Sequence, residues 1–530
     1  MLLRVRSKVE SATASAGRGG EEVRTSEHGL KADAISFWEG LVVALASTAH
    51  DYSLAAVIGS LAVIVGFYAP AALLLAFVPM FFIAAAFYWM NKADQDCGTT
   101  FAWVTRAIGP ETGWIAGWAV FMTGVLVVGS LADVATYTFY DLIGADGLYD
   151  SEAAVVRGAV LLVAVMTTVC VIGTEASARL QMVLMGLQIG PLLLFAAVTL
   201  VKVWSGDGPG SSFDPQLAWF NPLNIDAGNL NPFSAESGDL VAALLLGIFI
   251  YWGWESAVNL NEETAGDVSR PGLAGLISTL ILLVTYAAVA TAVLAWKGIG
   301  GAANFDDDEG ILAAYAGGVL GDDLGKLVLL AIVVSALAST QTTILPAART
   351  SLSMARAEAF PQAFGEVSRR FFTPVFSTIA VGVLAVVWYV PGKLISENFL
   401  FDSLTALGLM IAFYYALTGF ACVVYYRREI PKTLRNFVFI GLGPAIGAII
   451  LTYIFVKALF NFSDPANSYT GQEWLGVAPP AVIGVGMLLV GVVLLFGWRL
   501  YKREPFFKRR PEVADPALLA PQPTIAGGSQ

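Results

Sequence analysis

The sequence has few of the side chains from which enzyme centres are usually built. Its 530 residues include only three cysteines, Cys97, Cys170 and Cys422, and two histidines, His28 and His50. The cysteines show neither a disulfide framework nor a zinc-binding spacing, and two histidines cannot form a metal centre alone. A catalytic triad signature is also missing. We therefore expect no enzyme activity, no metal and no cofactor.

Charge is scarce as well. Asp, Glu, Lys and Arg make up 13% of the chain, whereas 57% is hydrophobic and the mean hydropathy is +0.70. A chain of this length and composition is typical of a polytopic membrane protein rather than of one soluble domain. We attribute the net charge of −11 to acidic loops and expect no nucleic-acid partner.

The two ends of the chain are polar. Residues 1–34 are rich in Ser, Gly and charge and lack the apolar stretch of a secretory signal peptide. They predict a disordered cytoplasmic tail. Residues 511–530, rich in Pro and Ala, predict a second one. The transmembrane domain is expected over residues 35–501.

Hydrophobic runs within this domain predict an all-α protein of twelve spans, since a span needs about 20 apolar residues. We expect these spans at Ile35–Gly66, Ala71–Met90, Gly113–Phe139, Ala153–Ile172, Leu180–Trp204, Leu240–Leu260, Leu273–Trp296, Leu327–Pro346, Thr373–Val390, Phe399–Tyr426, Phe437–Leu459 and Ala481–Tyr501.

The distribution of basic residues predicts the orientation. With both termini placed inside, most of the 30 Lys and Arg residues fall in cytoplasmic segments. The positive-inside rule therefore places both termini in the cytoplasm, and we expect a multi-pass protein of the plasma membrane.

The sixth span carries an acid at hydrocarbon depth. Only about fifteen apolar residues, from Leu240, precede Glu255, fewer than a complete span needs. Acids at that depth are costly and usually functional. Gly253, between Trp252 and Trp254, lets the backbone leave the helix, which is tolerated there only when the backbone lines a cavity. We interpret this stretch as a broken helix lining a binding site.

The first span contains a similar interruption. Ile35–Gly66 is too long for one upright helix, and its centre is the polar run from Ser47 to Ser53. A tilted single helix is one interpretation. Two half-helices that meet at this run fit better.

The two broken helices suggest an inverted repeat. Helices 1–5 (about 35–204) and 6–10 (about 240–426) would each open with a broken helix, and two helices at about 437–501 would follow. An odd number of spans in each half places the second half upside down in the membrane, with the substrate site between the two breaks.

Several motifs resemble those of the amino acid–polyamine–organocation permeases. Helix 6 reads Tyr251-Trp-Gly-Trp-Glu255, followed by Glu262-Glu263 and Arg270-Pro271, and Asp94 to Trp114 is similar to the first cytoplasmic loop of the family. The stretch from Arg349 to Pro374 also matches. The resemblance covers roughly residues 35–500. It implies a five-plus-five inverted-repeat transporter of amino acids or amines.

We therefore expect a secondary transporter of an amino acid or small amine that works by alternating access. A polyamine or organic-cation transporter is the alternative, and a substrate-gated membrane sensor is a remote one. The sequence leaves open which amino acid is carried, whether a proton or sodium is coupled or exchange occurs, and the oligomeric state.

The predicted site residues form three groups. The substrate-binding group is Ser47, Thr48, Ala49, His50, Asp51, Ser53, Tyr251, Trp252, Gly253, Trp254 and Glu255. Candidates for coupling or ion binding are Asp133, Ser335, Ser339 and Thr340, for which helix packing is an equal or stronger alternative. Glu39, Glu262, Glu263 and Arg270 are expected to form an inner gate, with a surface cluster as the alternative.

The helix 1 break distinguishes this chain from the family that it resembles. Many relatives have small residues or proline at the helix 1 break, whereas this chain has His50-Asp51. The Asp51 carboxylate would attract a substrate ammonium or carry a proton. An internal pair with protonated His50, or a wet structural acid, is the other interpretation.

Overall fold

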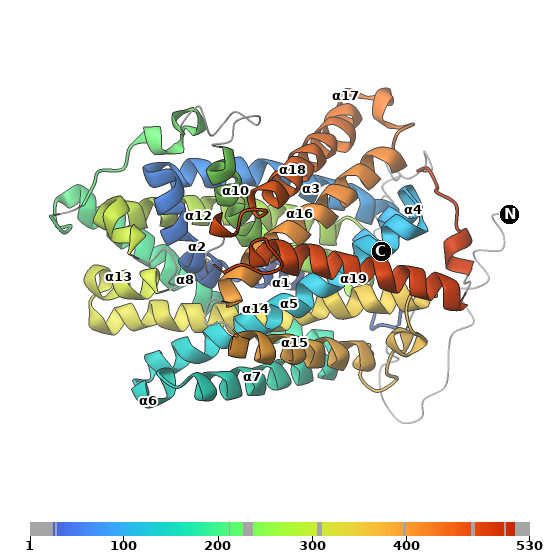
Figure 1. The fold of residues 1–530 in the computed structure, drawn as a ribbon, viewed down its shortest axis with the longest axis horizontal. Coiled ribbons are helices and arrows are strands. Elements are labelled where there is room, and N and C mark those ends of the chain that lie inside the picture. The colour runs from blue at the N-terminus through green and yellow to red at the C-terminus, as the bar shows by residue number, and fades with distance from the viewer. Residues whose placement is uncertain are drawn as a thin grey trace, which may run out of the picture.

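Helices account for nearly all the regular structure of the chain. The computed structural model describes residues 25–26, 29–210, 212–225, 237–304, 310–395, 399–467, 472–502 and 505–514. Within these residues there is no β-strand, only isolated bridges such as that between Ile35 and Thr264. The helices and short helical turns run in a single bundle (Figure 1).

The helices follow in this order: α1 (Phe37–Ser47), α2 (His50–Val65), α3 (Ala69–Ala93), α4 (Thr100–Ala107), α5 (Pro110–Leu142), α6 (Asp146–Tyr149), α7 (Glu152–Ile172), α8 (Thr174–Ser205), α10 (Ser237–Tyr251), α11 (Ser256–Asn259), α12 (Arg270–Ala303), α13 (Ile311–Leu320), α14 (Asp322–Arg356), α15 (Val375–Ile395), α16 (Phe399–Tyr425), α17 (Leu434–Asn436), α18 (Gly443–Asn461) and α19 (Pro479–Lys502).

Ten stretches of the described chain are long and apolar enough to cross a membrane. One of them, Phe37–Ala93, is 57 residues long and contains α1, α2 and α3, while Leu240–Tyr251 and Ile311–Leu320 are shorter apolar helices. The prediction of an α-helical, multi-pass membrane protein is therefore confirmed. Several helices extend beyond the predicted spans. The largest extension is that of α14, which continues through Pro346 to Arg356, because a proline is tolerated inside a membrane helix when neighbouring groups satisfy the freed backbone.

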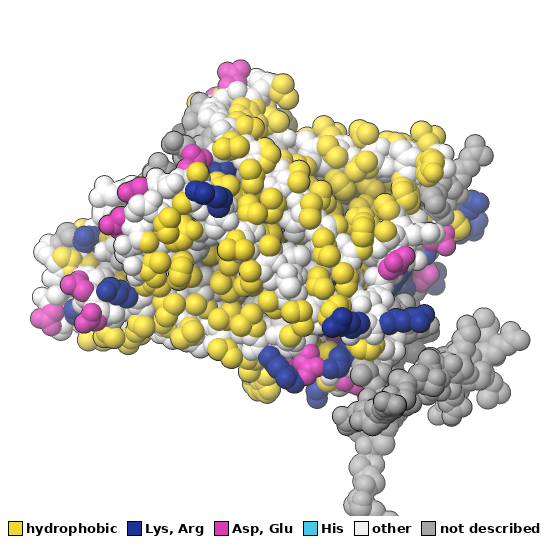
Figure 2. All heavy atoms as spheres, turned by 90° about the horizontal axis from the view of Figure 1, so that it is seen from below, with side chains coloured by type: hydrophobic (Ala, Val, Ile, Leu, Met, Phe, Trp, Pro, Cys, Tyr) yellow, Lys and Arg dark blue, Asp and Glu magenta, His cyan; other side chains and the backbone are white. Residues whose placement is uncertain are grey.

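Two long helices lie at the centre of the bundle. Of the 18 most hydrophobic consecutive residues of each helix, 94% are buried in the protein in α5, compared with 33% in α7. Small residues allow the close packing, since a Cβ at Gly124 of α5 would lie 2.9 Å from the Cβ of Ala347 on α14. The outer helices α7 and α15 instead expose large apolar side chains such as Leu161 and Val387. Figure 2 shows the resulting hydrophobic face, with charged side chains gathered toward its two ends.

Parts of the predicted tails pack against the same end of the bundle. Leu30, expected in a disordered segment, is fully buried with Cys97 and Leu352. Near the other end of the chain, the backbone N–H of Glu512 donates to the carbonyl of Arg106 in α4. The disorder prediction is thus wrong for residues 29–34 and 511–514, while residues 1–24, 27–28 and 515–530 lie outside the described residues.

The close packing of α5 predicts a stability effect at Gly129. A Cβ there would overlap the Cβ of Tyr389 on α15. We expect Gly129→Ala to destabilise the protein by about 1–3 kcal/mol, the usual cost of overpacking. Thermal unfolding of the purified protein in detergent measures this. Gly186→Ala on α8 is the control, because its Cβ would have no atom within 4 Å. An equal unfolding temperature for both variants would contradict the packing argument.

Candidate functional site

The first interruption separates α1 from α2. Helix α1 ends at Ser47 and α2 begins at His50, and Ala49 between them adopts left-handed backbone angles (φ 47°, ψ 44°). The Thr48 hydroxyl donates to the Leu45 carbonyl at 2.7 Å, and the Ser53 hydroxyl donates to the Thr48 carbonyl at 2.8 Å. These side-chain bonds add to the backbone hydrogen bonds at the end of α1, and so stabilise an irregular backbone away from water.

The second interruption separates α10 from α11. Helix α10 ends at Tyr251 and α11 begins at Ser256, with Gly253 at φ 118° between them. The Glu255 carboxylate accepts hydrogen bonds from the Gly253 N–H at 3.1 Å and from the hydroxyls of Tyr414 and Tyr415 on α16, at 2.8 and 2.5 Å. Glu255 is only 5% exposed, so these donors replace water around its oxygens.

The two interruptions touch each other. A Cβ on Gly253 would lie 2.5 Å from the Ser47 carbonyl oxygen. The hydroxyls of Ser47 and Ser256 are 2.6 Å apart, and the Ser339 hydroxyl of α14 donates to the Ser47 carbonyl at 2.9 Å. Only glycine permits this approach at position 253, because a side chain would collide with the backbone and strain φ.

Two small cavities lie beside the contact between the two interruptions. Each has a volume of about 10 Å³, close to the least that one water molecule needs. Their walls are mainly apolar side chains, with hydroxyls and backbone at the breaks. Residues of α5, α10 and α14 line them: Val120, Gly124, Val127, Leu131, Phe249, Thr343, Pro346 and Ala347.

The structure divides the predicted substrate-binding residues into two sets. Those that line the cavities are Ser47, Thr48, Ala49, Ser53, Trp252, Gly253 and Glu255. His50, Asp51, Tyr251 and Trp254 line neither of them. Instead, the Tyr251 ring packs against Phe77 and Tyr286, and the Trp254 ring against Phe87 and Tyr415.

The side of the cavities that α5 forms was not predicted from the sequence. Val120, Gly124, Val127 and Leu131 follow a helical spacing and therefore share one face of α5. That periodicity was visible in the sequence, but every face of this buried helix is apolar, so nothing singled it out. Tyr414 of α16, which the sequence suggests as core or wall, also lines one cavity and accepts a hydrogen bond from the Trp252 indole.

The predicted coupling residues lie in different places. Asp133 on α5 is paired with two residues of α15, because Tyr389 donates to it and the Lys393 ammonium is 3.3 Å away. The Ser339 hydroxyl donates to the Ser47 carbonyl at the first interruption, whereas the Thr340 hydroxyl donates to the Ala336 carbonyl of its own helix.

The predicted inner gate is only partly assembled. Glu263 forms a fully buried ion pair with Arg349 at 3.1 Å, and Glu262 pairs with Arg356 at 3.2 Å. Neither arginine was among the expected gate residues. The expected member Arg270 donates instead to the Ala265 carbonyl. Glu39 is bound in the capping box of α1, where it accepts from the Ser36 N–H, and so lies outside the pairs.

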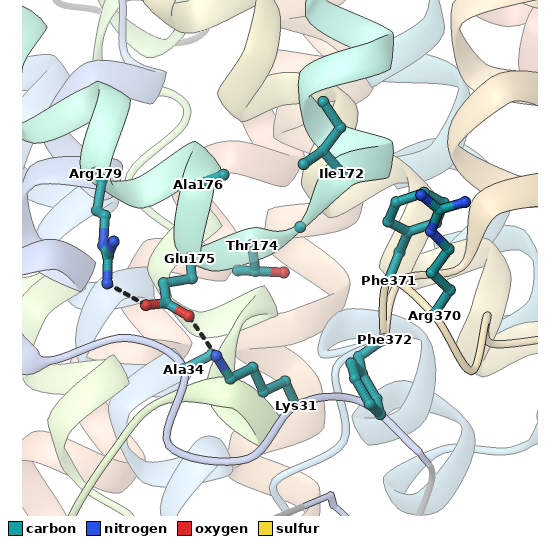
Figure 3. A pocket seen from close by; sticks show the side chains of 11 residues that line it. Lys31, Ala34, Ile172, Thr174, Glu175, Ala176, Arg179, Arg370, Phe371 and Phe372 are labelled. Carbon is teal, nitrogen blue, oxygen red and sulfur yellow. Dashed lines mark hydrogen bonds and ion pairs between the residues drawn. The ribbon is translucent and has the colours of Figure 1, made fainter. Parts of the chain in front are cut away.

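The segment before α1 covers these ion pairs. Its backbone bonds to the α11–α12 connection, with the Ile35 N–H donating to the Glu263 carbonyl at 3.1 Å. Lys31 pairs with Glu175 at the start of α8, which Arg179 also contacts (Figure 3). A pocket of about 390 Å³ opens between these residues and the Phe371 side chain. The covering segment, residues 29–36, therefore helps to close this end of the bundle.

Comparison with known proteins adds to this geometry. Residues 35–413 match the model of the family described as amino acid permease. The chain belongs to this family. It is also 22% identical over 413 residues to the branched-chain amino acid permease BcaP of Lactococcus lactis subsp. cremoris (strain MG1363), a match covering 75% of this chain and 83% of the relative. The resemblance seen in the sequence motifs is confirmed, and this permease is an amino acid transporter of the membrane.

The contact between the two interruptions predicts the effect of Gly253→Ala. The added Cβ would meet the Ser47 carbonyl, so the breaks must separate, and we expect transport in proteoliposomes to fall at least tenfold with little loss of folded protein. Gly144→Ala is the matched control, since Gly144 also has a positive φ of 65° but no atom within 4 Å of a new Cβ. Normal transport by Gly253→Ala would show that the contact is dispensable.

The buried Glu263–Arg349 pair predicts a change in the reactivity of Cys97. Removing one partner of a buried pair costs about 3–5 kcal/mol, so Glu263→Gln should loosen this end of the bundle and expose the Cys97 thiol. A membrane-permeant maleimide should label Cys97 at least several-fold faster, while Cys422, buried in another part of the bundle, keeps its rate. Glu111→Gln, which breaks an exposed pair with Arg499, is the control. Unchanged labelling of Cys97 would show that this ion pair does not hold that end of the bundle closed.

Proposed function

We propose that this permease carries neutral, apolar amino acids across the plasma membrane by alternating access. The observation that supports this most directly is the apolar cavity wall beside two touching helix interruptions. A binding site usually combines such a wall with a few polar groups that fix the orientation of the ligand. Here the hydroxyls of Ser47 and Ser53 and the backbone of the breaks supply those groups.

The proposed architecture is a five-plus-five inverted repeat with twelve crossings. Two come from Phe37–Ala93, nine from the other long apolar stretches and one from Leu240–Tyr251 with α11. Helices α1–α2 and α10–α11 would be the two discontinuous spans. Their contact at Ser47 and Gly253 supports this arrangement, because inverted-repeat transporters bind substrate between their broken helices.

The substrate would bind with its charged groups at the break. The first N–H groups of a helix have no partner within it, and they attract an anion. The beginning of α2 is therefore the proposed position of the substrate carboxylate, next to the cavity-lining Ala49. The ammonium group would face the carbonyls at the end of α1, and the side chain would lie against α5.

The structure is closed around this position. Cavities of about 10 Å³ are too small for an amino acid, so α1 and α10 must move away from α5 and α14 to admit one. Trp252, which lines both cavities and donates to Tyr414, would close over the substrate. The pairs Glu263–Arg349 and Glu262–Arg356 would open and close the cytoplasmic side.

Transport of a cationic amine is the second candidate. The observation in its favour is the Glu255 carboxylate in the cavity wall. That carboxylate already accepts three hydrogen bonds, which satisfies much of its capacity. Asp51, the other acid expected to attract an ammonium, does not line the cavities. The relative whose printed name specifies branched-chain amino acids also favours a neutral substrate.

A proteoliposome exchange assay tests this proposal. Vesicles preloaded with unlabelled leucine should take up labelled leucine, isoleucine and valine, but not lysine or putrescine. Uptake of the two cations alone would reject the neutral-substrate proposal and favour the second candidate.

The cavity wall makes a further prediction about specificity. Val127→Ala enlarges the apolar side, so the preference should shift toward phenylalanine over valine by about tenfold, as a change of one or two methylene groups usually does. Val128→Ala is the matched control, since Val128 is equally buried on α5 but lines neither cavity. The same shift in both variants would place the side-chain subsite elsewhere.

A further inference from the structure

His50 and Asp51 are buried immediately behind the proposed substrate position. Ala49 is the last cavity-lining residue before them, and both side chains are only 1% exposed. Their imidazole Nε2 and carboxylate Oδ2 atoms are 3.7 Å apart. The pair therefore adjoins the break without lining either cavity.

The carboxylate lacks the hydrogen bonds that a buried charge requires. Among the described residues, neither oxygen of Asp51 completes a hydrogen bond. The nearest donor is the Ser335 hydroxyl of α14, and one neutral hydroxyl does not balance a buried negative charge. A bare carboxylate in this environment would be very costly, so the pair must be neutralised by a cation.

The groups around the pair offer no alternative partner. From α12, Tyr286 lies near Asp51, but its hydroxyl donates to the Ile250 carbonyl at 2.6 Å. From α10, the Tyr251 ring stacks edge-on against Tyr286. Among the described residues, Asp51 forms an ion pair with His50 and with no Lys or Arg.

The histidine presents an acceptor to the carboxylate. His50 Nδ1 is 3.4 Å from the Leu45 carbonyl, which can only accept, so Nδ1 carries the hydrogen. In the neutral ring, Nε2 is then a lone-pair acceptor. Two acceptors therefore face each other, and one proton placed between them would satisfy both.

We infer that His50 and Asp51 form a site for one coupling proton, separate from the substrate cavity; this inference rests on the proposed function. From the water-exposed side, the proton forms an O–H bond on Asp51 and donates to Nε2, and the charge of the pair changes from −1 to 0. On the other side the O–H bond breaks and the proton returns to water. The site adjoins the carboxylate end of the substrate, so removing its negative charge favours substrate binding.

The same residues fit sodium less well. Sodium prefers a cage of several oxygens, whereas a ring nitrogen faces Asp51 here. Asp133, the other buried acid considered for coupling, is neutralised by Lys393 and Tyr389. A proton on the His50–Asp51 pair is the assignment that these contacts favour.

Proteoliposomes with an imposed pH gradient test the inference. For one proton per amino acid, a gradient of one pH unit, acid outside, should raise leucine accumulation by up to about tenfold. Asp51→Asn should abolish this accumulation and retain leucine exchange, which needs no net proton movement. Asp133→Asn is the matched control and should keep both activities. Replacing sodium by choline should change nothing.

Each other result would overturn the inference. The inference fails if Asp51→Asn retains gradient-driven accumulation, or if only Asp133→Asn loses it. It also fails if accumulation depends on sodium rather than on pH. Exchange without any gradient effect in the unmodified protein would reject the proton site alone, whereas no exchange of any amino acid would reject the proposed function.

A second variant covers the case in which Asp51→Asn does not fold. His50→Gln removes the Nε2 acceptor but keeps the carboxylate, so gradient-driven accumulation should require a more acidic medium than in the unmodified protein. Leucine exchange by the same variant shows that it is folded. An accumulation profile identical to that of the unmodified protein would show that His50 does not share the proton.

Discussion

The need to satisfy polar groups away from water governs the centre of this permease. Two helices stop inside an apolar bundle, and each free backbone or acidic group there must find a partner. Hydroxyls of Thr48, Ser53 and Ser339 bond the carbonyls near the first break, and Tyr414 and Tyr415 bond the acid of the second. The irregular backbone is therefore stabilised beside the proposed substrate position.

The same requirement distinguishes the buried acids. Asp133 has an ammonium and a phenol as partners, Glu263 has a guanidinium, and Glu255 has two phenols and a backbone N–H. Each of these sites is complete without a further ligand. Among the described residues, Asp51 has the His50 imidazole and the Ser335 hydroxyl beside it but no cationic Lys or Arg, so its charge is unbalanced until a cation binds. The partners of each acid, rather than its depth alone, thus indicate its role.

One end of the bundle and its centre are closed by different interactions. One end is held by the pairs Glu263–Arg349 and Glu262–Arg356 and by residues 29–36 packed over them. The centre is closed by apolar contact between α5 and α14 and the breaks, which leaves only about 10 Å³ in each cavity. Ion pairs can be exchanged for water when the end opens, whereas apolar walls can close on an apolar substrate.

The sequence by itself determined the membrane class and the family, and it suggested where two helices would be interrupted. Hydrophobic runs are contiguous in the chain, and Gly253 and the polar run at Ser47 interrupt them visibly, so local patterns were sufficient. Only the tertiary structure decided which side chains share a cavity. His50 and Asp51 follow Ala49 in the chain, yet the helix turns them away from the cavity. The partners Arg349 and Arg356 come from a helix distant in sequence, and such pairings depend on packing that no local pattern encodes.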